Sequence, residues 1–521
     1  MRWVKILSIS DKRIVYLVIF SVVFAVTRLA GIKTDVINPD AVNWHFRSQQ
    51  FIVGLKQLEF EKTYQHYHPG VTLMWITGVP IELLKQITGI QHYNNTNFIY
   101  FHFIAKFSLI LFQLVLSLVL IYFLSRATDF QRAFLVMSLL SLEPFFLGNS
   151  RLYHMDILFT LVSFLGIILL YLSVHRNSFL YSVATGFVFS LSFLTRSIGV
   201  GLVLYTLGYF FIMYVSKSAD FSLKKLLVIL SAFVVSSFIL FPALWVRPVH
   251  YISEIFSEGQ RIGVRKGHSQ LFFGKQTDDA GVLFYPLVLV MKMSPVMLFG
   301  IICCLISSCR KFNIYNLSFK FIGKNSFLFV ITSFYFGYFA IMSVLSKKID
   351  RYMLFMFPLL GYCAVVGLER FYSYIHKRFG ISLKVYYVFF MTFFAATLFS
   401  FYPYYFTYTS PVFLNAKTAN SVIGQKPFGV GIFELKDFVN ENYKDGVNLG
   451  FIDTKPMKAV YANSGVFDIR VNDPGDYDLI ILGINEEFPD KVLKSSQRFE
   501  LSSVITINGL EYWRIYDKKT N

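Results

Sequence analysis

Long apolar runs recur along the chain, and they restrict it to one class of fold. They lie near residues 14–32, 103–124, 133–149, 155–174, 179–195, 198–216, 224–245, 282–308, 325–346, 351–369 and 382–401. A helix needs about 20 mostly apolar residues to cross a bilayer. With 55% hydrophobic and 15% charged residues, the chain is also too apolar for a soluble globule of 521 residues. The runs therefore predict a mainly α protein, a polytopic transmembrane helical bundle of about eleven spans.

The basic residues predict the orientation of this bundle. The formal net charge is +18, but no soluble basic domain carries it, so no nucleic-acid partner is predicted. Lys and Arg instead cluster at residues 2–13, 126–132, 217–225, 310–324 and 370–384, in alternate loops. Loops of this kind stay on the cytoplasmic side. With an odd number of spans, the intervening loops and the chain after residue 402 then lie outside the cytoplasm.

The chain divides into two predicted domains. Residues 1–405 form the membrane domain, with long external loops at about 33–102 and 246–281 and helical patterns at 40–58 and 70–88. Between residues 406 and 521 polar residues become frequent, and the helix-like "FELKDFVNENY" is followed by the strand-like "YDLIILG". This alternation predicts a small external α/β domain at the C-terminus.

The stretch "NPDAVNWHFRSQQF" places two opposite charges just beyond the first span. Asp40 and Arg47 are two helical turns apart, so in a helix they share one face. That face continues through the apolar residues Trp44, Phe51, Leu55 and Leu58. Charges on an otherwise buried stripe indicate a wet cavity beneath this helix.

The sequence places further charges at the predicted external ends of the spans. The positive-inside rule alone would keep Lys and Arg out of short external loops. With the first two, the set is Asp40, Arg47, His68, Arg151, Asp156, Arg196, Arg247, Lys347, Lys348 and Arg351. Charges near a bilayer are costly unless they pair or line a wet cavity, so such a group is a functional-site hypothesis. Several cations with two carboxylates suit a phosphate together with a group that must lose a proton.

Each of these residues also has a purely structural interpretation, which the sequence leaves open. Arg47 would pair with Asp40 or extend to the interface, and Arg151 would pair with Asp156 at the start of the fourth span. The cations of "SKKIDRY" (346–352) would bind lipid headgroups. His68, before a proline, would be an interfacial histidine.

The order of several short motifs resembles a known group of enzymes. "PDAVNWHFR", "HPG" (68–70), "SRLYHMD" (150–156), "FLTRS" (193–197), "FPALWVRP" (241–248) and "KKIDRYMLFMFP" (347–358) follow one another. This order is similar to that of the membrane-embedded C-type glycosyltransferases. The chain looks most like the protein O-mannosyltransferase family and its relatives that add aminoarabinose to lipid A, the phospholipid-carrier-dependent glycosyltransferases. The similarity covers roughly residues 10–400.

The resemblance implies a polyprenyl-phosphate sugar donor and assigns roles to four residues. Asp40 matches the acid of the first external loop at the reaction centre, Asp156 matches a second carboxylate, and Arg151 and Arg351 match cations of the phosphate site. Family members commonly have a second acid directly after the first, where this chain has Ala41. Ala41 cannot make the metal or acceptor contact of that second acid, whereas the acid at position 40 is present.

These residues fit one chemical step. The lipid phosphate of a phosphodiester donor is a good leaving group that needs positive charge, for which Arg151, Lys347, Lys348 and Arg351 are candidates. The acceptor hydroxyl needs a base, for which Asp40 is the candidate, and one direct displacement inverts the anomeric centre. The prediction is an integral-membrane glycosyltransferase of the cell envelope that transfers a mannose-like hexose or another sugar to a protein or glycolipid acceptor outside the cytoplasm.

Two other functions compete with this prediction. One is a transporter or flippase of an anionic lipid or lipid-linked sugar, although no inverted repeat is visible. The other is a non-catalytic membrane assembly subunit whose external domain binds a partner. No cofactor is required by the sequence. Asp40, His68 and Asp156 are candidate ligands for a divalent cation, but their spacing does not demand one.

Overall fold

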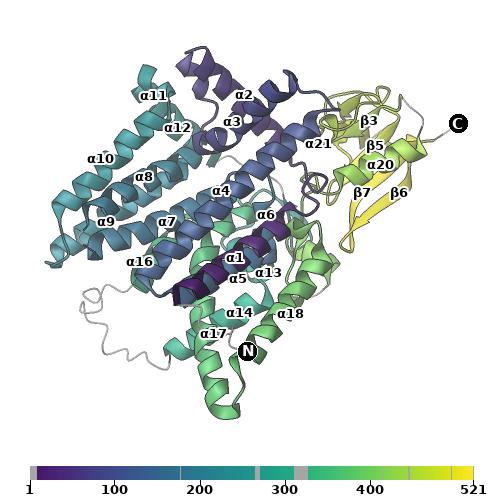
Figure 1. The fold of residues 1–521 in the computed structure, drawn as a ribbon. Helices are drawn as coiled ribbons and strands as arrows, with labels where there is room; N and C mark the ends of the chain where they lie inside the picture. The colour runs from purple at the N-terminus through teal and green to yellow at the C-terminus, as the bar shows by residue number, and fades with distance from the viewer. Residues whose placement is uncertain are drawn as a thin grey trace, which may run out of the picture.

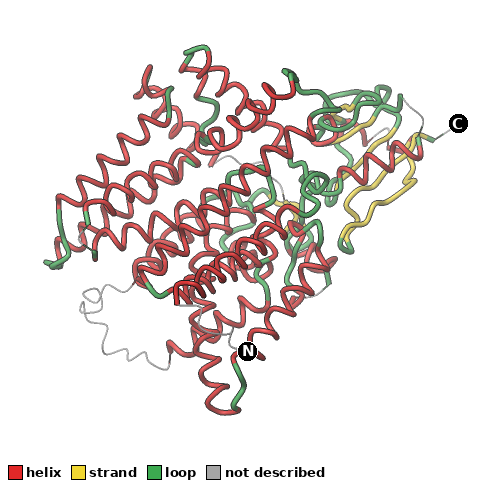
Figure 2. The backbone as a smooth tube through the Cα atoms, viewed as in Figure 1, coloured by secondary structure: helices red, strands yellow, loops and turns green. Residues whose placement is uncertain are grey.

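The computed structural model describes residues 9–176, 178–263, 270–309, 327–413, 415–443, 446–493 and 496–519. A body of long helices carries a small domain with a β-sheet at one end (Figure 1). Figure 2 shows that the long strands are confined to that end and that helices make up most of the rest. The predicted fold class, a mainly α membrane bundle with a small C-terminal α/β domain, is confirmed.

Every predicted apolar run lies on a helix. Those of the first half are α1 (Ile9–Leu29), α4 (Phe98–Ala127), α5 (Phe130–Leu142), α6 (Pro144–Ser150), α7 (Asp156–His175), α8 (Phe179–Thr195), α9 (Gly201–Val215) and α10 (Leu223–Leu240). Those of the second half are α13 (Phe284–Lys292), α14 (Pro295–Cys309), α16 (Phe327–Val344), α17 (Phe357–Phe379) and α18 (Leu383–Phe401).

The structure has fewer candidate spans than the predicted eleven when the described helices are judged by their length and composition. Seven helices are long and apolar enough to cross a membrane, or up to nine if each of two bent pairs counts as one span. The remaining two runs are α1 and α8. Charged residues lie at both ends of α1, and α8 has only 17 residues.

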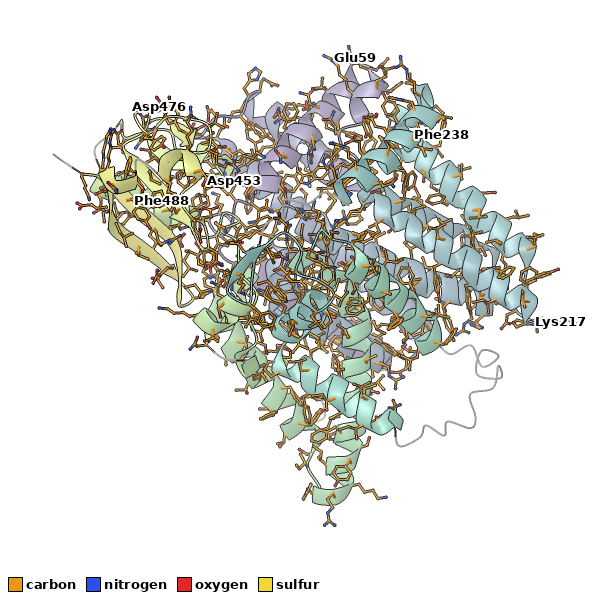
Figure 3. All side chains as sticks on the ribbon, turned by 180° about the vertical axis from the view of Figure 1, so that it is seen from behind. Glu59, Lys217, Phe238, Asp453, Asp476 and Phe488 are labelled. Atoms are coloured by element: carbon orange, nitrogen blue, oxygen red, sulfur yellow. The ribbon has the colours of Figure 1, made fainter. Side chains whose placement is uncertain are left out.

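Loop helices lie at the end of the body that the sheet domain occupies. They are α2 (Pro39–Lys56), α3 (Val71–Thr88), α11 (Ala243–Val246) and α12 (Pro248–Gly263), with the 3-10 turns η1 (Phe60–Thr63), η2 (Ser197–Val200) and η4 (Asp350–Met356). The helices predicted at 40–58 and 70–88 are thus confirmed. Leu58 is an exception, because α2 has ended there and its side chain is 72% exposed. Glu59 and Lys217, from loops predicted on opposite sides of the membrane, lie at opposite ends of the body (Figure 3).

Helix α7 is the centre of the helical body. Its sequence is apolar on every side between Asp156 and His175, and nearly all of its residues are buried. A helix that is hydrophobic all round is stable only where other helices surround it. Its buried position carries Asp156, its first residue, into the interior of the protein.

Two spans are broken, and their breaks meet. The pair α5 and α6 bends by 73° at Glu143, and the pair α13 and α14 bends by 115° near Ser294. The Glu143 carboxylate accepts hydrogen bonds from the backbone N–H of Ser294 at 2.5 Å and from its hydroxyl at 2.7 Å. Backbone groups freed by a break in a span must find partners within the protein. Glu143 therefore ties the two broken helices together.

The sheet domain, residues 416–518, has a mixed five-stranded sheet of order β4-β3-β5-β7-β6. Its elements are α19 (Ala416–Val422), α20 (Ile432–Asn442), β3 (Leu449–Phe451), α21 (Lys455–Lys458), β4 (Val466–Asp468), β5 (Leu479–Gly483), α22 (Asp490–Leu493), β6 (Phe499–Ile507) and β7 (Leu510–Lys518). Strands β4, β3 and β5 are parallel, and β5, β7 and β6 are antiparallel. A two-stranded hairpin, β1 (Gln270–Phe272) and β2 (Lys275–Thr277), lies in the loop at 246–281.

The sheet domain packs on the helical body through a shared apolar core. Val36, Ile37, Phe98 and Leu152 of the body belong to the same buried cluster as the domain's own core residues. Val36 also forms a β-bridge with Val430. This contact holds the domain directly against the start of α2.

A tight helix crossing allows a stability test. A Cβ atom on Gly367 of α17 would lie 1.9 Å from the carbonyl oxygen of Gly300 on α14. We expect Gly367→Ala to force the two helices apart and to destabilise the protein by roughly 1–3 kcal/mol, as overpacking does. Thermal unfolding in detergent measures this. Gly337→Ala on α16 is the control, because no atom lies within 4 Å of a Cβ there; equal stability of both variants would contradict this packing.

Candidate active site

The site begins at the first turn of α2. The side-chain oxygen of Asn38 accepts a hydrogen bond at 2.7 Å from the backbone N–H of Ala41, and Pro39 occupies the first helical position. Such a cap and proline fix where the helix starts. Asp40 is consequently held in the first turn, where its side chain remains 39% exposed.

Asp156 approaches Asp40 from the opposite side. It is the first residue of α7, and its carboxylate is buried. The N-terminus of a helix favours a negative charge, because its unpaired N–H groups point outward. A buried carboxylate still requires cations or donors to compensate its lost hydration.

Two arginines from distant segments supply those cations. Arg196, which follows α8, forms a short ion pair with Oδ1 of Asp156. Arg351, in η4, places Nη1 at 3.4 Å from Oδ2 of Asp156 and Nη2 at 3.5 Å from Oδ2 of Asp40. Arg351 therefore joins the two carboxylates that the sequence singled out.

His154 completes the cluster, and the sequence reasoning missed it. Its Nε2 lies 3.2 Å from Oδ2 of Asp40, and its Nδ1 lies 3.0 Å from Oδ2 of Asp156. The residue stands inside the quoted motif "SRLYHMD", two positions before Asp156, which was the available signal. An imidazole ring has two nitrogens that point in different directions, so one histidine can contact two carboxylates at once.

This arrangement controls the protonation of the cluster. Burial would raise the pKa of the Asp40 carboxyl, but the hydrogen bond from His154 and the charges of His154 and Arg351 hold it well below its usual range. Burial would lower the pKa of His154, yet the charge of Asp156 and the hydrogen bonds to both carboxylates raise it. Asp40 is therefore ionised at neutral pH.

A cavity of about 400 Å³ opens beside the cluster. Its polar lining includes Arg196, Lys347 and His68, with Tyr352 and Tyr67 from neighbouring segments. Burial and the nearby charge of Arg196 hold the pKa of His68 well below its usual value, so this histidine is neutral. The cavity thus has cations on its wall without a carboxylate, which suits an anionic group.

An apolar cavity of about 260 Å³ adjoins the first one. It lies between α7, α9 and α16, and its lining is almost wholly hydrophobic. Ile198 lines both cavities. A cavity with cations on its wall therefore adjoins an apolar space between helices.

Arg151 does not lie in the cluster, contrary to the prediction for it. Its Nε lies 3.0 Å from Asp35, while Nη1 and Nη2 donate to the carbonyl oxygens of Thr27 and Ala30 at 2.9 and 2.8 Å. Lys106 also pairs with Asp35 and donates to the carbonyl oxygen of Ile32. Cations are stabilised at helix C-termini, and these two satisfy the end of α1. The partners of Arg151 are therefore protein groups away from the cluster.

Lys348 and Arg247 also point elsewhere. Lys348 donates to the carbonyl oxygens of Met342 and Ser343 at 3.2 and 2.6 Å, at the end of α16. Arg247 forms a pair with Glu61 at 3.4 Å, and its side chain is 63% exposed. A helix-end contact and an exposed ion pair account for these two cations without a substrate.

Arg47 stays near Asp40 but pairs with a ring. Its guanidinium carbon lies 4.7 Å from the centre of the Trp44 ring. Burial lowers the pKa of Arg47, and the charge of Asp40 opposes this effect. The predicted shared face is therefore present, although the ion-pair partners of Asp40 are His154 and Arg351.

No group of three His, Cys, Asp or Glu side chains suited to a metal ion occurs in the part of the chain that the structure describes. The oxygens of Asp40 and Asp156 face His154, Arg196 and Arg351. Nitrogen donors thus compensate the charge of both carboxylates.

The sheet domain faces this cluster. Helix α21 contacts α2, and the charge of Asp40 acts on Asp453, whose pKa burial raises. Asp453 lies on the side of the domain that faces the helices, whereas Asp476 lies away from them (Figure 3). The first turn of α2 therefore lies at the boundary between the two parts of the molecule.

Solved structures share this architecture. No protein-family model matches the chain, and no curated protein matches it in sequence. ArnT from Cupriavidus metallidurans in the apo state superposes with a TM-score of 0.55 at 13% identity over 97% of this chain and 98% of that one. The same protein bound to undecaprenyl phosphate gives 0.51 at 13% identity over 98% of both chains. The chain has the ArnT fold. This confirms the resemblance predicted from the motifs at the level of architecture.

The placement of Arg151 generates a test. We expect Arg151→Ala to destabilise the protein by roughly 3–5 kcal/mol, because it leaves the buried Asp35 with one cation fewer. Thermal unfolding in detergent measures the loss. The control is Arg247→Ala, which removes an exposed pair and should leave the unfolding temperature near that of the wild type. Wild-type stability of Arg151→Ala would contradict the structural role.

Proposed function

We propose that this chain is an integral-membrane glycosyltransferase that moves a sugar from a polyprenyl-phosphate donor to an acceptor hydroxyl. One observation carries the proposal. Two carboxylates, a histidine and two arginines from distant segments meet at one end of the membrane helices, beside a cavity with cations on its wall. Such a pairing of base and cations is what this transfer requires.

The two adjoining cavities suit the two parts of the donor. The carrier phosphate occupies the cavity with cations on its wall, near Arg196 and Lys347, and Arg351 directly precedes Tyr352 of its lining. The first carbons of the prenyl chain enter the apolar space between α9 and α16, and the rest lies in the bilayer. The crystallised complex of ArnT with undecaprenyl phosphate supports a carrier of this class for the shared fold.

The reaction is a single displacement. The acceptor oxygen attacks the anomeric carbon, the bond from that carbon to the phosphate oxygen breaks, and the polyprenyl phosphate leaves with the electron pair. Asp40 takes the hydroxyl proton, for which its partial exposure leaves room. Attack opposite the leaving group inverts the anomeric centre. Asp156 acts by holding Arg196 and His154 in place.

In this proposal each predicted domain binds a different substrate. Residues 1–405 form the membrane domain and hold the donor, while residues 406–521 cover the acceptor side. The basic residues of the loops at 126–132, 217–225 and 370–384 favour an extracytoplasmic site through the positive-inside rule. A mannose-like hexose as the sugar, and a protein or glycolipid as the acceptor, remain the proposed substrates. Mass spectrometry of glycolipids and envelope proteins from cells with and without the gene identifies both.

Replacement of the proposed base is the direct test. Asp40→Asn keeps the shape of the side chain but cannot take a proton, so we expect transfer to fall roughly 10²–10⁴-fold. The measurement is transfer from polyprenyl-phosphate sugar by the purified protein, with thermal unfolding as a check of folding. Asp476→Asn, on the distant side of the sheet domain, is the matched control (Figure 3). Near-normal transfer by Asp40→Asn would remove Asp40 from this role.

The proposed base also makes the transfer rate depend on pH. Asp40 must be ionised to act, and His154 helps to hold the pKa of its carboxyl low. In His154→Gln the pKa of the Asp40 carboxyl rises. As the pH is lowered, this variant should therefore lose activity at a higher pH than the wild type does. Initial transfer rates measured from acid to neutral pH give the pH at which activity is half lost. If the rate falls equally at every pH and this midpoint does not move, His154 does not affect the pKa of Asp40.

A further inference from the structure

A loop of the sheet domain, residues 425–431 ("QKPFGVG"), contacts the charge cluster through Phe428, whose ring lies against Arg351. Val430 pairs with Val36, and its carbonyl oxygen accepts a hydrogen bond at 2.8 Å from the indole N–H of Trp513. A Cβ atom on Gly429 would lie 1.8 Å from the carbonyl oxygen of Ile37. The loop is thus fixed on one side to the chain that leads into α2 and on the other to the sheet.

This loop places an aromatic ring on the arginine that joins the carboxylates. The guanidinium carbon of Arg351 lies 4.2 Å from the centre of the Phe428 ring. Phe406 stacks with the same ring, with centres 5.2 Å apart and planes 19° from parallel. Arg351 is largely shielded from solvent, and such shielding strengthens the attraction between a cation and a ring.

The backbone at Phe428 is in an unfavourable conformation. Its φ is +45°, in the left-handed region that residues other than glycine rarely adopt. Strain of this kind persists only where the surrounding structure imposes it, and it concentrates at functional sites. Here the bridge of Val430 and the close approach of Gly429 impose it, and its result is the contact between Phe428 and Arg351.

The other contacts of Arg351 are longer than usual. Hydrogen bonds between a guanidinium and a carboxylate are normally about 2.7–2.9 Å long. Those of Arg351 measure 3.4 Å to Asp156 and 3.5 Å to Asp40. The guanidinium is therefore close to the ring but only loosely held by the carboxylates, which leaves its N–H groups able to turn toward an anion.

We propose that Phe428 is a positioning residue that holds Arg351 ready for the carrier phosphate, so that the sheet domain sets the affinity of the donor site. The inference rests on the proposed function. Without the ring, the attraction of two carboxylates draws Arg351 into normal hydrogen bonds with Asp40 and Asp156. Its N–H groups are then occupied, and the carrier phosphate binds less tightly.

The experiment uses the full chain in detergent and undecaprenyl phosphate as the probe. Phe428→Leu keeps an apolar side chain without a π face, and we expect it to weaken binding about 5- to 30-fold, the range for a cation–π contact from partial to full desolvation. Phe428→Tyr keeps the ring and should restore binding. In an Arg351→Gln background, Phe428→Leu should have no further effect. Native mass spectrometry over a range of probe concentrations measures each affinity.

A second aromatic residue separates positioning from simple packing. Phe406→Leu removes the other partner of the Phe428 ring but leaves the ring on Arg351, so its affinity should stay near that of the wild type. Unchanged binding by Phe428→Leu overturns the inference. An equal loss of affinity when Phe428→Leu is added to Arg351→Gln also overturns it. So does an equal loss of affinity in Phe406→Leu, because either result would indicate general packing. Absence of saturable binding to the wild type would instead overturn the proposed function itself.

Discussion

The buried Asp156 carboxylate is the interaction on which the site depends. It lies at the N-terminus of the central helix α7, where hydration is lost, and it is compensated by Arg196, Arg351 and His154. These partners come from the end of α8, from η4 and from the turn before α7. Because removing one partner of a buried ion pair leaves an uncompensated charge, the carboxylate holds these three segments next to one another. The position of α7 in turn follows from its uniformly apolar sequence.

The same principle separates functional cations from structural ones. Arg151 and Lys106 share Asp35 and bind carbonyl oxygens at the end of α1, and Lys348 does the same at the end of α16. Where helices end near the edge of a bilayer, the unpaired carbonyl groups at their C-termini need hydrogen-bond donors, just as an anionic substrate does. Cations that have this role are saturated by the protein. Arg351, with long carboxylate contacts and a ring beside it, is not.

The sheet domain is part of the site, because its loop at 425–431 contacts both the entry to α2 and Arg351. Its shared core with Val36, Ile37, Phe98 and Leu152 keeps it in place. Only part of this arrangement could be predicted from the sequence. It predicted helix α20 and strand β5 correctly, since each follows from local periodicity. It did not predict that Phe428 would contact the cluster, because a single aromatic residue in a loop has no periodicity to indicate its partner.

The sequence by itself determined the class of fold and the helices, because the transfer of a long apolar run out of water depends on that run alone. It also determined which residues were candidates, since charges beside a membrane are costly wherever they occur. Only the tertiary structure decided which of them meet. Arg151 and Asp156 are near neighbours in the chain, yet they belong to different clusters, whereas Asp40 and Arg351 come from opposite ends of the membrane domain and meet. The reason is that ion pairing depends on how helices pack, and a turn between two helices can send adjacent side chains to opposite sides.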